Sequence, residues 1–121
     1  MLRSILFFLA LNALSVYLVQ QLLDGFVVTG GILGTVFVGS VIGLLNVFVK
    51  PILKVLALPF VFLTLGLFVI VINALILWLA EQAVALIDVQ SIHFNIDGVF
   101  TYLVAAVILG VLNFAFQKVL G

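Results

Sequence analysis

Four long apolar runs, separated by short segments that hold most of the polar residues, divide this chain. A helix needs about 20 apolar residues to cross a membrane, because each residue rises about 1.5 Å and the hydrocarbon core is roughly 30 Å thick. All four runs reach that length, and they are apolar all round rather than alternating like a membrane strand. The pattern predicts an all-α, single transmembrane domain over residues 1–121, with spans at about 5–23, 30–49, 57–80 and 99–119.

The connection between the second and third runs is bounded by Pro51 and Pro59. Proline cannot continue the hydrogen-bond ladder of a helix, so the second span should end near Lys50 and the third should start, or kink, near Pro59. The linker at residues 50–58 is too apolar for a solvated loop. We expect it to lie at the membrane interface, where lysine side chains reach the headgroups; a partly re-entrant path is the alternative.

The longest predicted loop covers residues 81–98. Within it Ile92, Phe94 and Ile96 alternate with polar residues, which is the period of a short strand with one apolar face. We expect this strand to pair with residues 26–29.

Charged residues occur at the edges of the apolar runs and are sorted by sign. The cations Arg3, Lys50, Lys54 and Lys118 fall at one set of edges, and the acids Asp24, Glu81, Asp88 and Asp97 fall at the alternate set. Short loops rich in Lys and Arg remain in the cytoplasm. The pattern therefore predicts a multi-pass membrane protein with both termini in the cytoplasm, anchored on that side by Arg3, Lys50, Pro51, Lys54, Pro59 and Lys118.

The composition removes several classes of function. With 68% hydrophobic and 7% charged residues, the chain lies far from the usage of soluble domains. Four cations and a net charge of zero give no electrostatic footprint for nucleic acid. The chain has no cysteine, no span carries an ionisable residue at its centre, and the serines have no nearby base. We therefore predict no catalytic residue, no metal site and no cofactor, and hence no enzyme.

The two halves of the chain resemble each other. A shift of 61 residues places residues 7–14 over 68–75, and a shift of 67 superposes the second run on the fourth, so the longer second loop absorbs the difference. The pattern predicts a tandem duplication of a two-helix unit, with parallel repeats about an axis along the membrane normal; chance similarity of apolar helices is the alternative. The paired positions include Asn12 with Asn73, Gln20 with Glu81, Gly43 with Gly110 and Asn46 with Asn113.

Four asparagines lie within the spans: Asn12, Asn46, Asn73 and Asn113. An amide in hydrocarbon needs a partner, and interhelical hydrogen bonds of this kind contribute about 0.6 to 2 kcal/mol in membranes. Two interpretations are open. The asparagines either join neighbouring helices, or they bind a solute or line a pore.

Small residues form a stripe along the second span and recur in the fourth. Such a face lets another backbone approach closely. The stripe predicts close helix packing, either within the chain or between copies in a homo-oligomer. Its members are Gly31, Thr35, Gly39 and Gly43, with Ala106 and Gly110 in the matching places.

The stretch from Gly43 to Pro59, followed by Leu63-Thr64-Leu65-Gly66 and then Asn73-Ala74, resembles the mycobacterial four-helix phage holin family, superfamily IV. The resemblance implies a small four-helix protein of the bacterial cytoplasmic membrane, in a family whose biochemical role is poorly defined. A holin would release a lytic enzyme by oligomerising into a lesion. A wide water-filled lesion needs polar helix faces, which these spans do not offer.

The leading functional hypothesis is a non-enzymatic membrane-organising or envelope-stress protein that contacts the lipid bilayer and self-associates through its small-residue faces. The first alternative is a holin-like permeabiliser. The second is a narrow channel or lipid-handling module lined by the four asparagines. The oligomer number and any small-molecule ligand stay open at this point.

Overall fold

The computed structural model describes residues 2–89 and 91–120. In chain order its elements are α1 (Leu2–Leu22), β1 (Phe26–Thr29), α2 (Gly31–Phe48), α3 (Lys50–Leu56), α4 (Leu58–Leu63), α5 (Phe68–Ile87), β2 (His93–Ile96) and α6 (Val99–Leu120). In the described part of the chain, four helices are long and apolar enough to cross a membrane, namely α1, α2, α5 and α6. The prediction of a four-span helical protein is confirmed, with a small sheet added.

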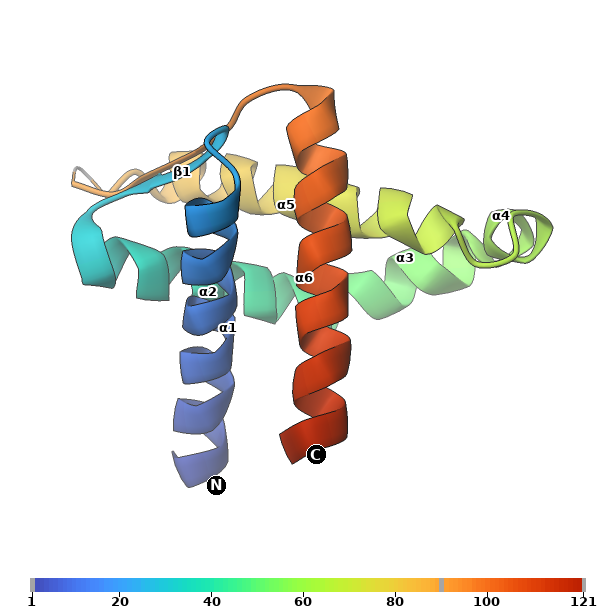
Figure 1. The fold of residues 1–121 in the computed structure, drawn as a ribbon, viewed down its shortest axis with the longest axis horizontal. Coiled ribbons are helices and arrows are strands. Elements are labelled where there is room, and N and C mark those ends of the chain that lie inside the picture. Colours follow the sequence, from blue (N-terminus) through green and yellow to red (C-terminus); the bar gives the residue numbers. More distant parts are fainter. Residues whose placement is uncertain (1, 90, 121) are drawn as a thin grey trace.

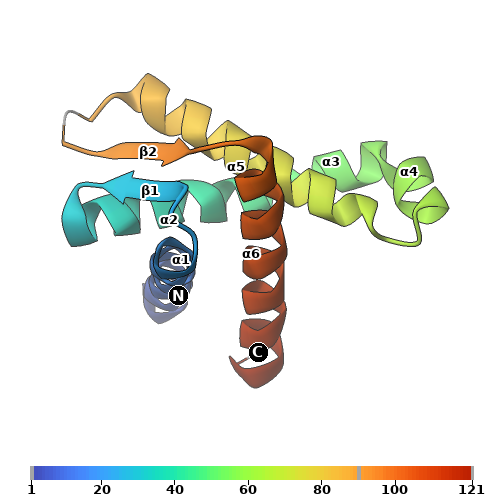
Figure 2. The same ribbon diagram turned by 45° about the horizontal axis from the view of Figure 1, so that its top comes forward.

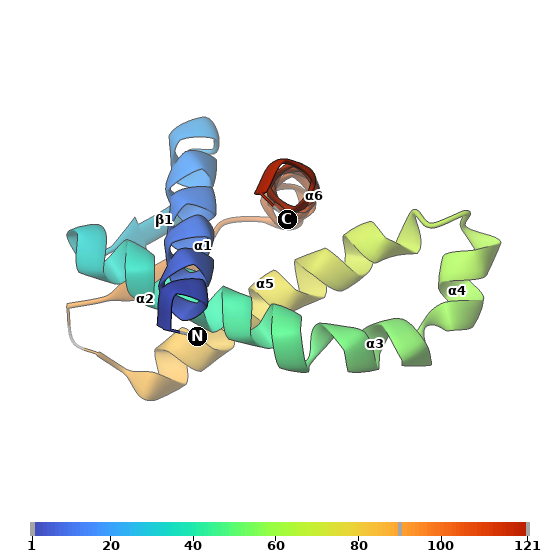
Figure 3. The same cartoon turned by 90° about the horizontal axis from the view of Figure 1, so that it is seen from below.

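The four long helices form a ring of contacts: α1 packs on α2, α2 on α5, α5 on α6, and α6 on α1. In Figure 1, α1 and α6 lie side by side below the sheet, whereas α2 and α5 lie across them (Figures 1 and 3). We call the end that holds β1 and β2 the sheet end. We call the region that comprises the start of α1, α3 and the end of α6 the cation end, because all four Lys and Arg residues belong to these segments.

The buried core occupies the half of the bundle nearer the sheet. Its residues come from the end of α1, the middle of α2, the middle and end of α5, and the first half of α6. Away from the sheet, α1 and α6 extend beyond α2 and α5 (Figure 1). Large apolar side chains are exposed near the sheet, as at Ile32 and Phe100, and far from it, as at Leu2, which suits contact with membrane lipid. The buried helix residues of this core are Val16, Val19, Val38, Ile42, Leu77, Ala80, Val84, Ala105, Ala106 and Leu109.

The two short strands close the sheet end. Phe26 pairs with Ile96 and Thr29 pairs with His93 in an antiparallel register (Figure 2). The rings of Phe26 and Phe94 meet edge to face, with their centroids 5.2 Å apart. Phe94 and Ile96 are buried and His93 is exposed, so the predicted alternation and the predicted pairing with residues 26–29 are both confirmed.

The third long helix lies later in the sequence than predicted: α5 ends at Ile87 rather than near residue 80. The prediction treated Glu81 as a helix edge in water. Instead, the Glu81 carboxylate lies within the helix and accepts hydrogen bonds from the Ile96 backbone N–H, at 3.2 Å, and from the Tyr102 hydroxyl. Because these donors satisfy the carboxylate, the helix continues beyond it and joins β2 and α6.

The start of α5 is also later than predicted, at Phe68 rather than near residue 57. The sequence Leu-Thr-Leu-Gly makes a tight turn here: Leu65 and Gly66 both have left-handed backbone angles, with φ of 57° and 92°. The Gly66 N–H donates to the Val61 carbonyl at 2.8 Å, and the Thr64 hydroxyl accepts from the Phe68 N–H at 2.9 Å. These bonds end one helix and begin the next.

The predicted interfacial linker is largely helical. The Val49 N–H donates to the Leu45 carbonyl at 2.8 Å, and the Leu53 N–H donates to the Val49 carbonyl at 3.1 Å, so the ladder passes from α2 into α3. Pro51 lies in the first turn of α3, where a missing N–H is tolerated. Helices α3 and α4 extend beyond the bundle as an arm with exposed apolar side chains, among them Phe62, which is 82% exposed (Figure 3).

The middle of the small-residue stripe faces α1 of the same chain. A Cβ atom added at Gly39 would lie 2.9 Å from the backbone nitrogen of Ala13, so the two helix backbones touch there. A Cβ atom at Gly43 would lie 3.0 Å from the Asn12 amide nitrogen. At the start of the stripe, Gly31 has no neighbouring atom within 4 Å of an added Cβ atom. The close packing at Gly39 and Gly43 is therefore within the chain.

We predict that Gly39→Leu destabilises the folded monomer by at least about 1–3 kcal/mol, because the new side chain must push two backbones apart. Thermal or SDS-induced unfolding in mild detergent measures the loss. Leu44→Phe is the matched control, since it adds volume on α2 at a side chain that is 52% exposed. A Gly39→Leu effect that varies with protein concentration would contradict this prediction, because an intrachain contact is independent of it.

We further predict that Glu81→Leu weakens the sheet, because the Ile96 N–H and the Tyr102 hydroxyl lose their acceptor, at a cost of about 1–3 kcal/mol for each buried group. Glu81→Gln keeps a carbonyl oxygen and should retain most of the stability. Hydrogen exchange of the Ile96 amide reports the difference. Gln82→Leu, at an exposed neighbour, is the control. Equal protection in the Leu and Gln variants would show that the carboxylate does not hold the strand.

Candidate functional site

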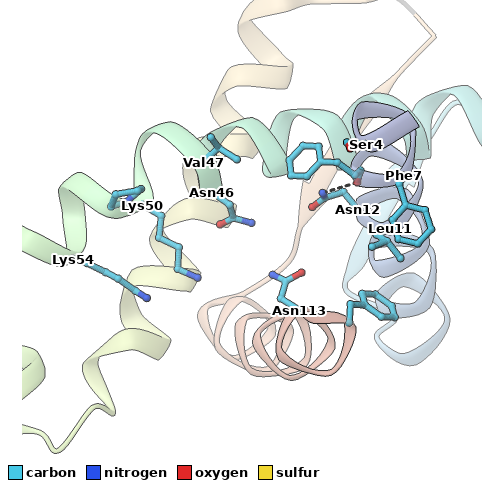
Figure 4. Close-up of a pocket in the computed structure, with 12 residues that line it drawn as sticks. Ser4, Phe7, Leu11, Asn12, Asn46, Val47, Lys50, Lys54 and Asn113 are labelled. Carbon is cyan, nitrogen blue, oxygen red and sulfur yellow. Dashed lines mark hydrogen bonds between the residues drawn. The ribbon is translucent and has the colours of Figure 1, made fainter. Parts of the chain in front are cut away.

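A cavity of about 660 Å³ lies at the cation end, where the helices diverge. Its walls come from the first half of α1, the end of α2, most of α3 and the last part of α6 (Figure 4). The lining residues are Ser4, Phe7, Phe8, Leu11, Asn12, Asn46, Val47, Lys50, Pro51, Lys54, Asn113 and Phe116.

The structure gathers the four asparagines around this cavity. Asn12, Asn46 and Asn113 line it directly, and Asn73 meets Asn46 and Asn113 around a small adjoining void. All four side chains are half-buried. The Asn12 amide donates to the Phe8 carbonyl of its own helix at 2.9 Å, whereas the amides of Asn46 and Asn113 point toward the open space (Figure 4). Bonding between helices through these amides stays a prediction.

Two lysines supply positive charge to one wall. Lys50 and Lys54 are one helical turn apart on α3, and both extend to the side on which Asn113 lies (Figure 4). None of the described residues that line the cavity is acidic. Burial lowers the pKa of Lys50, and the neighbouring charge of Lys54 lowers that pKa further. Charged Lys50 is therefore destabilised in this site by lost hydration and by repulsion.

The opposite wall is apolar. Phe7 and Leu11 of α1 lie on the side of the open space away from α3 (Figure 4), and Phe116 of α6 also lines the cavity. Val47 of α2 lies next to Asn46, nearer to α3 (Figure 4). Phe7 and Val47 are each 50% exposed, so the cavity is open at the surface of the bundle. The lining is thus amphipathic, with two lysines and three amides as its polar part and three phenylalanine rings as its aromatic part.

Other predicted site residues lie elsewhere. Pro59 belongs to the first turn of α4, away from the cavity, and the ammonium of Lys118 lies 5.6 Å from the ring centroid of Phe114. Gly31 and Thr35 line a second cavity, of about 450 Å³, between α1 and α2 near the sheet. Arg3 precedes the lining residue Ser4 on α1, Ala106 lies in the buried core, and an added Cβ atom at Gly110 would lie 3.2 Å from the Asn73 amide.

The sequence contained a signal for the polar wall that the predicted break at Pro51 concealed. Asn46, Lys50 and Lys54 recur every four residues, which places them on one face of a helix that continues through the proline. Phe8 and Asn12 have the same spacing in α1. Sequence reasoning missed Phe7, Phe8 and Phe116 as site residues, because an isolated apolar residue in an apolar span carries no distinguishing pattern.

The four apolar helices define a small multi-pass membrane protein. Residues 3–115 match the family described as mycobacterial 4 TMS phage holin, superfamily IV, and the chain belongs to that family. It is 36% identical over 114 residues to an uncharacterized protein of Streptomyces coelicolor, covering 90% of this chain and 89% of that protein. It is 34% identical over 108 residues to the uncharacterized membrane protein YvlD of Bacillus subtilis, covering 88% and 84%. No solved structure matches the chain significantly.

We predict that Lys50 in the folded protein reacts with an amine-acylating reagent at lower pH than it does in the unfolded chain, because only the neutral amine reacts and its folded-state pKa is lowered. With the folded pKa below the unfolded one, stability should rise as the pH increases through that window. Peptide mass spectrometry across a pH series measures the reaction midpoint.

Lys54→Gln should move the Lys50 midpoint to higher pH, because it removes the nearby like charge. Lys118→Gln removes a cation from the same end of the protein but outside the cavity lining and is the matched control. A midpoint that responds equally to both substitutions would contradict a local interaction between Lys50 and Lys54.

Proposed function

We propose that this protein is a non-enzymatic lipid-handling protein of the bacterial cytoplasmic membrane, which holds a lipid in the cavity at its cation end. The observation that supports this function is the amphipathic lining of the cavity, which combines the two lysines of α3 and three amides with the aromatic rings of α1 and α6. A membrane lipid likewise combines a polar headgroup with apolar acyl chains. Apolar pockets with a few convergent polar groups are typical ligand sites.

The position and size of the cavity suit a ligand that stays partly in the bilayer. A volume of about 660 Å³ accepts a headgroup and the first part of its acyl chains, while the remaining chains stay in the membrane. The half-exposed side chains of Phe7 and Val47 belong to helices that cross the hydrocarbon, so a lipid can enter from the side. No water-filled path through the membrane is needed for this mode of binding.

The charge pattern supports an orientation with the cavity in the cytoplasmic leaflet. Arg3, Lys50, Lys54 and Lys118 mark the cation end, and short basic segments remain in the cytoplasm. Both termini then lie in the cytoplasm, and the sheet lies on the outer side. The exposed apolar side chains of the arm would lie in the interface of the same leaflet.

Equivalent contacts in the two halves support a tandem duplication. An added Cβ atom at Gly110 would approach Asn73 as one at Gly43 approaches Asn12. At the sheet end, Gln20 contacts Thr35 and accepts from the Val28 N–H, as Glu81 contacts Tyr102 and accepts from the Ile96 N–H. Those distances are 3.4 Å for Gln20 to Thr35 and 3.3 Å for Val28 to Gln20, against 3.2 Å for Ile96 to Glu81.

The halves differ where the cavity forms. In the second half, Gln117 stands at the position equivalent to Lys50. The cationic wall therefore belongs to the first half alone, and the proposal is one lipid site per chain rather than two related ones.

The geometry favours lipid handling over the other hypotheses from the sequence. Gly39 and Gly43 already pack on α1, so these two positions give self-association no support. A holin-like lesion would need a continuous polar face, whereas the helix residues of the core between sheet and cavity are apolar apart from Ser15. Ser15 donates to the Leu11 carbonyl of its own helix at 2.9 Å.

We predict that Val47→Trp lowers the amount of lipid that remains bound after purification and washing in mild detergent, because the indole fills the cavity at its open wall. Lipid extraction followed by mass spectrometry measures the number of lipids per protein. We expect at least about a two-fold loss, which corresponds to a small decrease in the free energy of lipid binding. Leu44→Trp, one turn earlier on α2 and outside the lining, is the matched control.

The proposed function fails if wild type retains no more lipid than the Val47→Trp variant while both remain folded. Release of a trapped dye from liposomes that contain the wild-type protein would favour the permeabiliser instead.

A further inference from the structure

We propose, resting on the proposed function, that the cavity selects lipids whose headgroup has a net negative charge, with Lys50 and Lys54 holding the anionic phosphate group and Asn113 hydrogen-bonding beside them. The proposed function requires only that a lipid enters the cavity, whereas this selectivity depends on the class of lipid and on the residues that recognise it.

The charge of the cavity lining is unbalanced. Lys50 extends toward Asn113 and Lys54 extends to the same side behind it (Figure 4), and none of the described lining residues supplies a compensating carboxylate. Charges interact more strongly in a partly buried site than in water, because the effective dielectric constant is lower. An anionic headgroup neutralises this wall. A zwitterionic headgroup brings an ammonium of its own into the same space, which offsets the gain.

The poor solvation of Lys50 also favours an anionic ligand. Burial and the charge of Lys54 both disfavour its protonated form in the empty cavity. A phosphate oxygen within reach reverses both effects, since it replaces lost water as a hydrogen-bond acceptor and screens the two cations from each other. The charged lysines are therefore destabilised in the empty cavity and stabilised when an anion binds.

The neighbouring amides match the polar atoms of a phosphate headgroup. Asn46 and Asn113 each provide N–H donors for phosphate oxygens and a carbonyl acceptor for headgroup hydroxyls. The side chain of Asn12 is partly engaged, because its amide donates to the Phe8 carbonyl. Donors and acceptors beside two lysines suit a phosphodiester with a hydroxylated headgroup, or a phosphomonoester.

The aromatic part of the lining favours a lipid over free phosphate. Phe7, Phe8 and Phe116 make no favourable contact with a soluble anion, whereas they can pack against an acyl chain or glycerol backbone that continues from the phosphate. Binding of the headgroup and burial of the chain should therefore reinforce each other.

The experiment compares the protein in detergent micelles titrated with phosphatidylglycerol, phosphatidic acid, phosphatidylcholine or inorganic phosphate, with bound lipid counted by native mass spectrometry. Wild type should bind the two anionic lipids about 10-fold or more tightly than phosphatidylcholine, as expected for two lysines near an anionic lipid. Inorganic phosphate should compete only weakly.

Three variants locate the selectivity. Lys50→Gln with Lys54→Gln should abolish the preference while phosphatidylcholine binding persists, which also shows that the double variant is folded. Lys50→Arg with Lys54→Arg should keep the preference. Lys118→Gln should leave it unchanged, because Lys118 is a cation of the same end that does not line the cavity.

The outcomes distinguish the two proposals. Equal binding of phosphatidylcholine and phosphatidylglycerol by wild type overturns this inference and leaves lipid handling intact. No specific binding of any of the three lipids overturns the proposed function itself. A loss in Lys118→Gln as large as in the double variant overturns the assignment to the cavity and indicates general attraction to the cation end. If inorganic phosphate competes fully, the proposal that the bound anion belongs to a lipid headgroup is overturned.

Discussion

The close approach of α1 and α2 at Gly39 is the contact on which the arrangement of the bundle depends. With no side chain between them, the two backbones touch near the middle of both helices, where an added Cβ atom would lie 2.9 Å from Ala13. Helices that cross at a point must separate on either side of it. On one side lie the sheet, the buried core and the smaller cavity between α1 and α2, and on the other side the gap becomes the cavity lined by the lysines. Packing and the candidate site are therefore two results of one crossing.

Polar side chains at the sheet end form hydrogen bonds within the chain, whereas polar side chains at the cation end face a cavity. The first group contributes to stability, and the second group is the basis of the proposed function. At the sheet end, Glu81 and Gln20 accept hydrogen bonds from the strands, so polar side chains in the spans are satisfied within the chain. At the cation end, Lys50, Lys54 and Asn113 face an open space. Hydrocarbon makes unsatisfied polar groups costly, and a group left facing a cavity is thus a group available to a ligand.

The motif that marks the family has identifiable structural roles in this chain. The segment from Asn46 to Lys54 forms the polar wall on a helix that continues through Pro51, and Leu-Thr-Leu-Gly makes the turn that separates the arm from α5. The relatives in Streptomyces and Bacillus cover nearly the whole chain, so the same architecture is expected in them.

The sequence by itself determined the class, the number of spans and the short strand pair, because hydropathy over about 20 residues and strand alternation are local properties. It did not place the ends of α5, since Glu81 is tolerated in the helix only through donors from β2 and α6. The sequence also identified the asparagines and lysines as candidate site residues, but it did not predict that they line one cavity. Only the tertiary structure decided that α1, α2, α3 and α6 diverge to form one cavity, because that depends on where two backbones touch, which no single segment encodes.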